Sequence, residues 1–252
     1  MEACIIETRR TDPLIIGHRG AAGLAPENTQ AAFSAAVDLK VDAVEFDVQF
    51  TADGWPVVFH DETLERMAGV PARIRDYSES TLQGFDIGFR YGPEFRGERI
   101  PAVRDVASLV PPTVDLHAEV KDYDPVTEIH LKRLIEAFEK RGGLARVIFS
   151  SPHEDTISDI LRLHPGARTA LLLFRGVKVP TDAARRAAFL GCSAVHSDAS
   201  LVSHELVDVC HRHHMHLFAF TINERGMMRK LMQMGVNGFF TDYPDRLRET
   251  IQ

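Results

Sequence analysis

Two histidines near the start of the chain, His18 and His60, each lie beside a charged residue, Arg19 and Asp61. Histidine titrates nearest to neutral pH. Two histidines on opposite sides of a phosphoryl group could therefore deprotonate a nucleophile and protonate a leaving alcohol. Each also follows a short apolar run, which is typical of a buried strand that ends at a polar residue. We interpret His18 and His60 as a candidate acid and base pair.

Three carboxylates form a candidate metal site. Glu45 and Asp47 lie two residues apart on a predicted strand, so their side chains share one face, and Glu119 ends a later predicted strand. Like charges this close repel each other unless a cation lies between them. Oxygen ligands without cysteine suit Mg²⁺ or Ca²⁺ better than Zn²⁺. The alternative is that these carboxylates pair with Arg or Lys inside the fold.

Two basic residues accompany these groups. Arg19 could hold an anionic substrate through paired hydrogen bonds, and Lys121, which follows Glu119 by two residues, could do so as a point charge. The alternative is that both simply neutralise the carboxylates. The sequence alone leaves the two interpretations open.

Strand-like and helix-like segments alternate along the chain, and they must position these residues. Short apolar runs rich in β-branched or aromatic residues predict buried strands of a parallel sheet. The predicted strands span 14–16, 44–48, 114–120, 146–150, 168–173, 193–196, 216–220 and 238–240. The predicted helices span about 28–39, 126–140, 153–163, 181–190, 203–213 and 223–234, with a last one after Pro244. Eight such units predict a closed (β/α)₈ TIM barrel, with an open doubly wound sheet as the alternative.

Three local features refine this pattern. Asp53-Gly54 predicts a tight turn, after which residues 55–59 return as the second strand of a hairpin. Residues 61–100 are rich in Gly and Pro and poor in periodicity, so we interpret them as a small insertion after the second strand, over one face of the fold. We expect Asn28, in Pro26-Glu27-Asn28-Thr29, to be the N-cap of the first helix.

Composition limits the classes of function. The 252 residues are 44% hydrophobic and 26% charged, and the net charge of −7 argues against binding to nucleic acid or to an anionic membrane. The three cysteines, Cys4, Cys192 and Cys210, form no CxxC pair and fit reduced thiols. No segment reads as a signal peptide or as an apolar run of about 20 residues. We expect one domain over residues 1–252, in the cytoplasm.

Taken in order, several short segments resemble the glycerophosphodiester phosphodiesterase family over essentially the whole chain. The segments are Gly17-His18-Arg19-Gly20, Pro26-Glu27-Asn28-Thr29, Glu45-Phe46-Asp47-Val48, Thr51-Ala52-Asp53-Gly54, Val57-Val58-Phe59-His60-Asp61, Glu119-Val120-Lys121, and residues 235–244. Each segment is modest alone, but their order and spacing are highly specific.

The resemblance implies a (β/α)₈ barrel that hydrolyses small-molecule glycerophosphodiesters to glycerol 3-phosphate and an alcohol, with a divalent cation, Mg²⁺ or Ca²⁺. It implies metal ligands at Glu45, Asp47 and Glu119, an acid and base pair at His18 and His60, and phosphate contacts at Arg19 and Lys121. It also implies that residues 61–100 cover the site. One position departs from the family pattern, since Phe220 stands where the family usually has Trp and lacks the indole N–H donor. We expect Phe220 to shape the substrate pocket.

Three rival interpretations remain. A phospholipase D-type lyase would use similar groups and release a cyclic phosphate. A Schiff-base enzyme would use Lys121 as its nucleophile but leaves Glu45 and Asp47 without a role. A barrel that binds without catalysis is the third, because the presence of residues does not prove turnover. The sequence indicates no oligomeric state.

Overall fold

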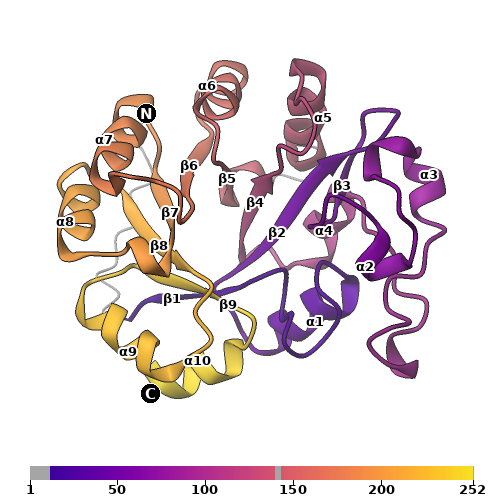
Figure 1. Cartoon of the computed structure of the whole chain (residues 1–252), viewed down its shortest axis with the longest axis horizontal. Coiled ribbons are helices and arrows are strands. Elements are labelled where there is room, and N and C mark those ends of the chain that lie inside the picture. The colour runs from indigo at the N-terminus through magenta and orange to yellow at the C-terminus, as the bar shows by residue number, and fades with distance from the viewer. Residues whose placement is uncertain (1–11, 140–142, 252) are drawn as a thin grey trace.

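Nine strands form one continuous sheet in the computed structural model, which describes residues 12–139 and 143–251. They are β1 (Leu14–Gly17), β2 (Ala43–Phe50), β3 (Pro56–Val58), β4 (Asp115–Val120), β5 (Val147–Ser151), β6 (Arg168–Leu173), β7 (Ala194–Asp198), β8 (His216–Phe220) and β9 (Gly238–Thr241). The strand order is β1-β9-β8-β7-β6-β5-β4-β2-β3, and β1 also pairs with β2, which closes the sheet. Because β3 pairs antiparallel with β2 outside the ring, the other eight strands make a closed parallel barrel (Figure 1). The predicted barrel and hairpin are confirmed, and the open doubly wound alternative is wrong.

Helices surround this barrel (Figure 1). They are α1 (Gln30–Asp38), α2 (Glu65–Ala68), α3 (Glu79–Leu82), α4 (Val103–Leu109), α5 (Glu128–Glu139), α6 (Glu154–Leu163), α7 (Pro180–Leu190), α8 (His204–Arg212), α9 (Arg225–Gln233) and α10 (Pro244–Ile251). The sequence did not predict α4, which is only two turns long but buries Val103, Val106 and Ala107. Its short apolar period carries less signal than that of the longer helices.

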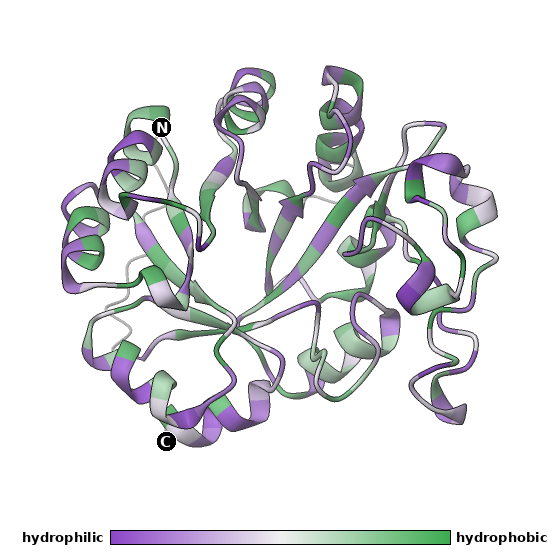
Figure 2. Cartoon of the chain, viewed as in Figure 1, coloured by the Kyte–Doolittle hydropathy of each residue, from purple (hydrophilic) through white to green (hydrophobic). Residues whose placement is uncertain are grey.

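Alternation along β2 explains how the barrel acquires a polar end. Val44, Phe46 and Val48 point outward into the main hydrophobic core, which the helices cover. Between them, Glu45 and Asp47 share the opposite face with Ala43, which belongs to a separate apolar cluster inside the barrel. Figure 2 shows the same division, with apolar residues concentrated on the strands and on the helix faces that meet them. The barrel interior is therefore apolar at one end and charged toward the carboxyl ends of the strands.

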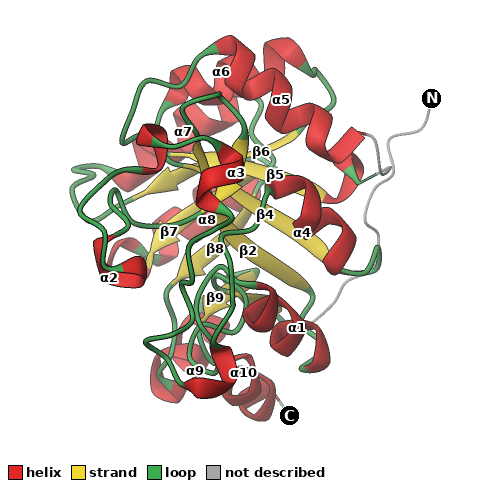
Figure 3. Cartoon of the chain, turned by 90° about the vertical axis from the view of Figure 1, so that its right-hand side faces the viewer, coloured by secondary structure: helices red, strands yellow, loops and turns green. Residues whose placement is uncertain are grey.

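The insertion between β3 and α4 has a small core of its own. It carries α2, α3 and two 3₁₀ turns, η1 (Ile74–Asp76) and η2 (Pro93–Phe95). Its buried side chains pack together beside the hairpin: Val57, Phe59, Leu64, Met67, Ile74, Leu82, Ile87 and Ile100. Figure 3, viewed from this side, shows the short helices α2 and α3 in front of the barrel strands. The predicted insertion is confirmed, and it is an organised layer.

Two further expectations concern membranes and thiols. Among the described residues, no helix has the length and apolar character needed to cross a membrane. Cys192 and Cys210 are buried free thiols, and burial raises the pKa of Cys210 to about 12. Cys4 lies outside the described residues.

Candidate active site

A cavity of about 110 Å³ opens at the carboxyl ends of the barrel strands, and we call it the mouth cavity. Seven of the eight site residues predicted from the sequence line it: His18, Arg19, Glu45, His60, Glu119, Lys121 and Phe220. The eighth, Asp47, is buried against them, with 1% of its surface exposed. Parallel barrels bring the carboxyl ends of distant strands to one edge, which is why residues 100 positions apart meet here.

The three carboxylates converge as predicted. Glu45, Asp47 and Glu119 each offer an oxygen within 4.8 Å of the others, close enough for one cation to reach all three. Lys121 already pairs with two of them, since its Nζ lies 2.9 Å from Asp47 Oδ1 and 2.7 Å from Glu119 Oε1. The three carboxylates thus converge and also pair with a basic side chain, so this geometry agrees with either sequence interpretation.

Burial makes the charges of this cluster interdependent. Burial, and then the charges of Asp47 and Glu119, raise the pKa of Glu45 well above its usual range. Burial alone would also raise the pKa of Asp47, but Lys121 and Arg19 hold it far below its usual range. The same pairing raises the pKa of Lys121, against the lowering effect of its own burial. Glu45 is thus the carboxylate whose ionisation most needs an additional cation.

Arg19 lies on a tight turn directly after β1. It has a left-handed backbone (φ 51°), and its N–H donates to Glu45 Oε2 at 2.9 Å. Its guanidinium donates to Glu27 Oε1 at 2.9 Å, and its Nε lies 3.3 Å from Asp47 Oδ2. The turn continues through Gly20 (φ 85°), where a Cβ would come within 2.6 Å of the backbone of helix α1. This close approach requires glycine and directs Arg19 toward the carboxylates.

His18 is held by the barrel itself. Its Nδ1 donates to Asp242 Oδ1 at 2.6 Å, just beyond β9, and its backbone N–H donates to Thr241. Asn223 in turn donates to Asp242 Oδ2 at 2.6 Å and accepts the Asp242 N–H at 2.9 Å. Burial would raise the pKa of Asp242, but its contacts with His18 and Asn223 lower it, so the residue is a carboxylate. The carboxylate fixes the proton on Nδ1 and leaves Nε2 as the unprotonated nitrogen of the neutral ring.

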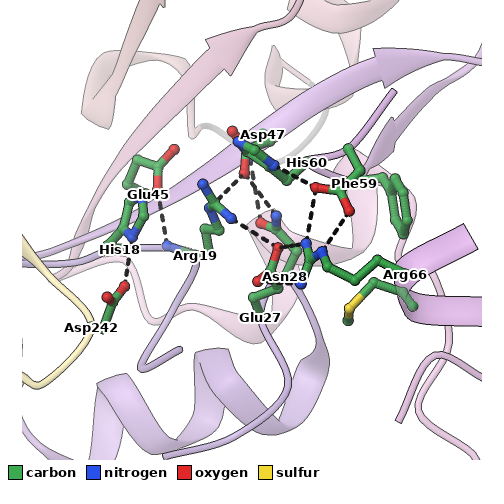
Figure 4. Close-up of polar contacts among 12 residues, drawn as sticks. His18, Arg19, Glu27, Asn28, Glu45, Asp47, Phe59, His60, Arg66 and Asp242 are labelled. Atoms are coloured by element: carbon green, nitrogen blue, oxygen red, sulfur yellow. Dashed lines mark hydrogen bonds and ion pairs between the residues drawn. The ribbon is translucent and has the colours of Figure 1, made fainter. Parts of the chain in front are cut away.

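His60 is held by the insertion. Its Nδ1 donates to Asp61 Oδ1 at 2.8 Å. Arg66 of α2 donates hydrogen bonds to both carboxylate oxygens of Asp61, at 2.6 and 2.9 Å. Arg66 also donates twice to Glu27, the partner of Arg19 (Figure 4). Hydrogen bonds from His60 and Arg66 lower the pKa of Asp61, although its burial opposes them. A chain of ion pairs therefore links His60 to Arg19 through Arg66.

Two expectations need correction. Thr29, not Asn28, caps helix α1, since Thr29 Oγ1 accepts the N–H of Ala32. Asn28 is instead buried with a left-handed backbone and donates to Asp47 Oδ2 at 2.8 Å. The insertion also lies beside the mouth cavity and does not cover it, because none of the described residues 61–100 is among those that line it. Its contacts with the site include the hydrogen bond between Asp61 and His60 and the ion pairs of Arg66 with Asp61 and Glu27.

One wall of the mouth cavity is apolar. It is formed by Leu172, Phe174, Phe220 and Phe240. Phe220 lies edge-on to Phe174 and Phe240, with ring centroids 6.1 and 6.3 Å away. The predicted place of Phe220 in a pocket beside the charged residues agrees with this geometry. Its ring presents no hydrogen-bond donor to that pocket.

Comparison with known proteins identifies the chain. Residues 18–246 match the glycerophosphoryl diester phosphodiesterase family. The chain belongs to this family. It is 31% identical over 239 residues to a glycerophosphodiester phosphodiesterase of Caldanaerobacter subterraneus, covering 93% of this chain and 96% of that one. It is 27% identical over 270 residues to the human protein named lysophospholipase D GDPD1, covering 93% and 84% of the two chains.

Solved structures of the glycerophosphodiester phosphodiesterase family share the barrel. An Oleispira antarctica phosphodiesterase, solved in complex with the product sn-glycerol-3-phosphate, matches with a TM-score of 0.86 at 27% identity. The match covers 95% of this chain and 96% of that one. A glycerophosphodiester phosphodiesterase of Thermotoga maritima matches with a TM-score of 0.78 at 23% identity, covering 94% and 98%, which bears on the fold alone. Family membership makes this chain a phosphoric diester hydrolase.

Proposed function

We propose that this chain hydrolyses glycerophosphodiesters to glycerol 3-phosphate and an alcohol, with a divalent cation and with His18 and His60 as acid and base. The observation that carries the proposal is the matched setting of the two histidines. Each has its Nδ1 on a carboxylate, at 2.6 Å for His18 and 2.8 Å for His60, and both line the cavity that holds Arg19 and Lys121. A small-molecule phosphodiester also agrees with the glycerol 3-phosphate in the Oleispira relative.

The two imidazoles divide the proton transfers. One Nε2 takes a proton from the nucleophile as its oxygen attacks phosphorus, and the other gives a proton to the alcohol oxygen as the P–O bond breaks. The nucleophile is water, or it is the hydroxyl of the substrate's own glycerol, in which case a cyclic phosphate forms and is then hydrolysed. Arg19 and Lys121 offset the negative charge of the phosphate, Arg19 by directed hydrogen bonds and Lys121 as a point charge.

The residues present fit a hard divalent cation. Glu45, Asp47 and Glu119 would hold it, since their oxygens converge within 4.8 Å. When bound, Mg²⁺ or Ca²⁺ would offset charge on the phosphate and favour the ionised nucleophile, which is worth several kcal/mol in such sites. Asn28 supports this set by fixing one oxygen of Asp47.

The test is glycerol 3-phosphate release from glycerophosphocholine and glycerophosphoethanolamine by metal-stripped protein, with Mg²⁺, Ca²⁺ or EDTA added. We expect release with at least one cation and none with EDTA. Glu45→Gln should remove the stimulation by cation, and Glu205→Gln, at an exposed position of α8, should keep it. Release that is unchanged in EDTA would contradict the cation. If phosphorus NMR instead showed a cyclic phosphate as the final product, that result would favour the lyase.

A further inference from the structure

A second cavity of about 340 Å³ lies beside the mouth cavity and shares Lys121 with it. We call it the side cavity. Its walls are the end of β2 and the following turn (49–52), the loop after β4 (123–127), Arg75 of the insertion and His130 of α5. The acid and base chemistry proposed above uses only Lys121 among these residues.

The two cavities differ in size, and each suits a different part of the substrate. A glycerophosphodiester has two arms on its phosphorus, a constant three-carbon glycerol and a variable alcohol. The mouth cavity, at about 110 Å³, has room for little beyond the phosphate and one short arm. The side cavity is about three times larger, at about 340 Å³, and it begins at Lys121, where the phosphate is expected to bind. The side cavity therefore offers the variable arm an adjoining space of suitable size along the β2 and β4 side of the barrel.

We propose that the side cavity binds the alcohol arm and selects a neutral, hydroxyl-rich alcohol over a cationic amino alcohol. The proposal rests on the function proposed above and adds the substrate class. It assigns the selection to Tyr123, Thr127 and the stacked rings of Phe50 and His130, all of which line the side cavity.

Charge in the side cavity disfavours an ammonium group. Asp124 is a carboxylate in its wall, and it already pairs with Arg75 and with Arg73, whose Nη1 lies 3.3 Å away. Burial lowers the pKa of His130 below its usual value, so this ring is neutral at pH 7. Asp124 is the acidic side chain among the described residues that line the side cavity, so a choline or ethanolamine arm would find a carboxylate whose charge is already matched. Desolvating an ammonium there without a new partner is unfavourable.

The uncharged groups of the side cavity suit a polyol. Burial raises the pKa of Tyr123, so its phenol keeps its proton and can both donate and accept a hydrogen bond. Thr127 adds a second hydroxyl at the rim. Phe50 and His130 stack with centroids 4.5 Å apart and planes 9° apart, and both rings belong to residues that line the side cavity. A few placed hydroxyls beside aromatic rings are typical of a pocket that orients a small neutral ligand.

The experiment compares four diesters on the full chain with saturating cation. Glycerophosphoglycerol and glycerophosphoinositol carry polyols, and glycerophosphocholine and glycerophosphoethanolamine carry amino alcohols. We expect kcat/KM at least tenfold higher for the polyol pair. Tyr123→Phe and Thr127→Val should each lower the ratio of polyol to choline kcat/KM about fivefold, mainly through KM, because each removes one hydrogen-bonding hydroxyl. Thr156→Val on α6, outside both cavities, is the matched control and should leave the ratio unchanged.

The outcomes of this experiment distinguish the side-cavity proposal from the proposed function on which it rests. Release of glycerol 3-phosphate from any of the four diesters supports the proposed function. Release with choline equal to or better than the polyols overturns the side-cavity proposal alone. An unchanged ratio in both Tyr123→Phe and Thr127→Val overturns it as well, because the alcohol arm would then bind elsewhere. No release from any diester overturns the proposed function and the substrate class together.

Discussion

The barrel contains two pairs of histidines in opposite settings. His18 and His60 lie at the mouth, and each donates its Nδ1 proton to a carboxylate. His117 of β4 and His196 of β7 lie deeper, and their side chains contact each other, with His117 Nδ1 3.2 Å from His196 Nε2. The rings of Phe218 and Phe240 enclose this second pair edge-on. We call the two sets the mouth pair and the floor pair.

The difference between the pairs shows that partners decide what a histidine can do. Burial, and then the neighbouring His196, lower the pKa of His117 far below its usual range, and burial lowers the pKa of His196 to about 3. The floor pair is therefore neutral at pH 7 and joins the strands by a single hydrogen bond. At the mouth, each imidazole instead contacts a carboxylate, His18 with Asp242 and His60 with Asp61. The function proposed above assigns proton transfer to the pair with carboxylate partners.

The largest expected effect is loss of turnover in the mouth pair. His18→Ala and His60→Ala should each reduce kcat by about 10³-fold, since each removes one acid or base from the reaction. The midpoint of urea unfolding should change little, because both rings are partly exposed, at 17% and 27%. The measurement is kcat for glycerol 3-phosphate release beside a urea titration of the same protein.

The control for the mouth pair is His213→Ala, an exposed histidine that follows α8. It should retain the parent kcat. If either mouth variant kept near-parent activity, that ring would have no part in proton transfer. The mouth pair and the floor pair would then not differ in catalytic role as proposed.

The next effect separates the two mouth histidines. Asp242→Asn should lower kcat by about 10²-fold. Both oxygens of Asp242 accept hydrogen bonds, from His18 Nδ1–H and from the amide of Asn223. In the variant, the new amide nitrogen would face one of these two donors and lose that hydrogen bond. Asp61→Asn should cost only about tenfold, because Arg66 keeps its two bonds to Glu27 and so keeps the insertion in place. Steady-state kcat and kcat/KM of both variants measure the difference. Equal losses would mean that the barrel and the insertion hold their histidines equally.

Much of this arrangement could be predicted from the sequence, for a physical reason. Each strand is a short apolar run, and the residues that end such runs meet at one edge of a parallel barrel, so His18, Glu45 and Glu119 were recognisable from position alone. The hairpin was predictable because Asp53-Gly54 suits a tight turn. Family resemblance added the roles, which spacing alone left open.

The partners of these residues were not predictable in the same way. Asp242 lies 224 positions from His18, and Arg66 lies in a segment without a clear period, so neither pairing has a local signal. Asn28 has the residue type of a helix cap, but its side chain donates a hydrogen bond to Asp47 instead of capping the helix. Alternation places His117 on the same face as Glu119, yet depth in the barrel and the contact with His196 appear only in three dimensions.

The smallest effect tests the floor pair through stability. A histidine whose pKa is about 3 when folded and about 6.5 when unfolded binds fewer protons in the native state. The free energy of unfolding should therefore fall as the pH drops from 6.5 toward 3, by about 1.4 kcal/mol per pH unit for this group. His196→Gln keeps a donor and an acceptor beside His117 but cannot titrate, so its stability should fall less steeply over this range. Urea midpoints at pH 7 and pH 4.5, in EDTA throughout, measure the two slopes.

The groups around His196 set the reference for this test. His117 contacts it directly, Phe218 and Phe240 pack edge-on against it, and His196 also lines the mouth cavity. The titrating residues around His196 are the same in both proteins. His213→Gln, at the exposed position used above, should keep the parent slope. Parallel lines for the parent and His196→Gln would show that His196 binds a proton as easily in the folded chain as in the unfolded one, which contradicts its lowered pKa. In that case burial among phenylalanines would not separate a structural histidine from a catalytic one in this barrel.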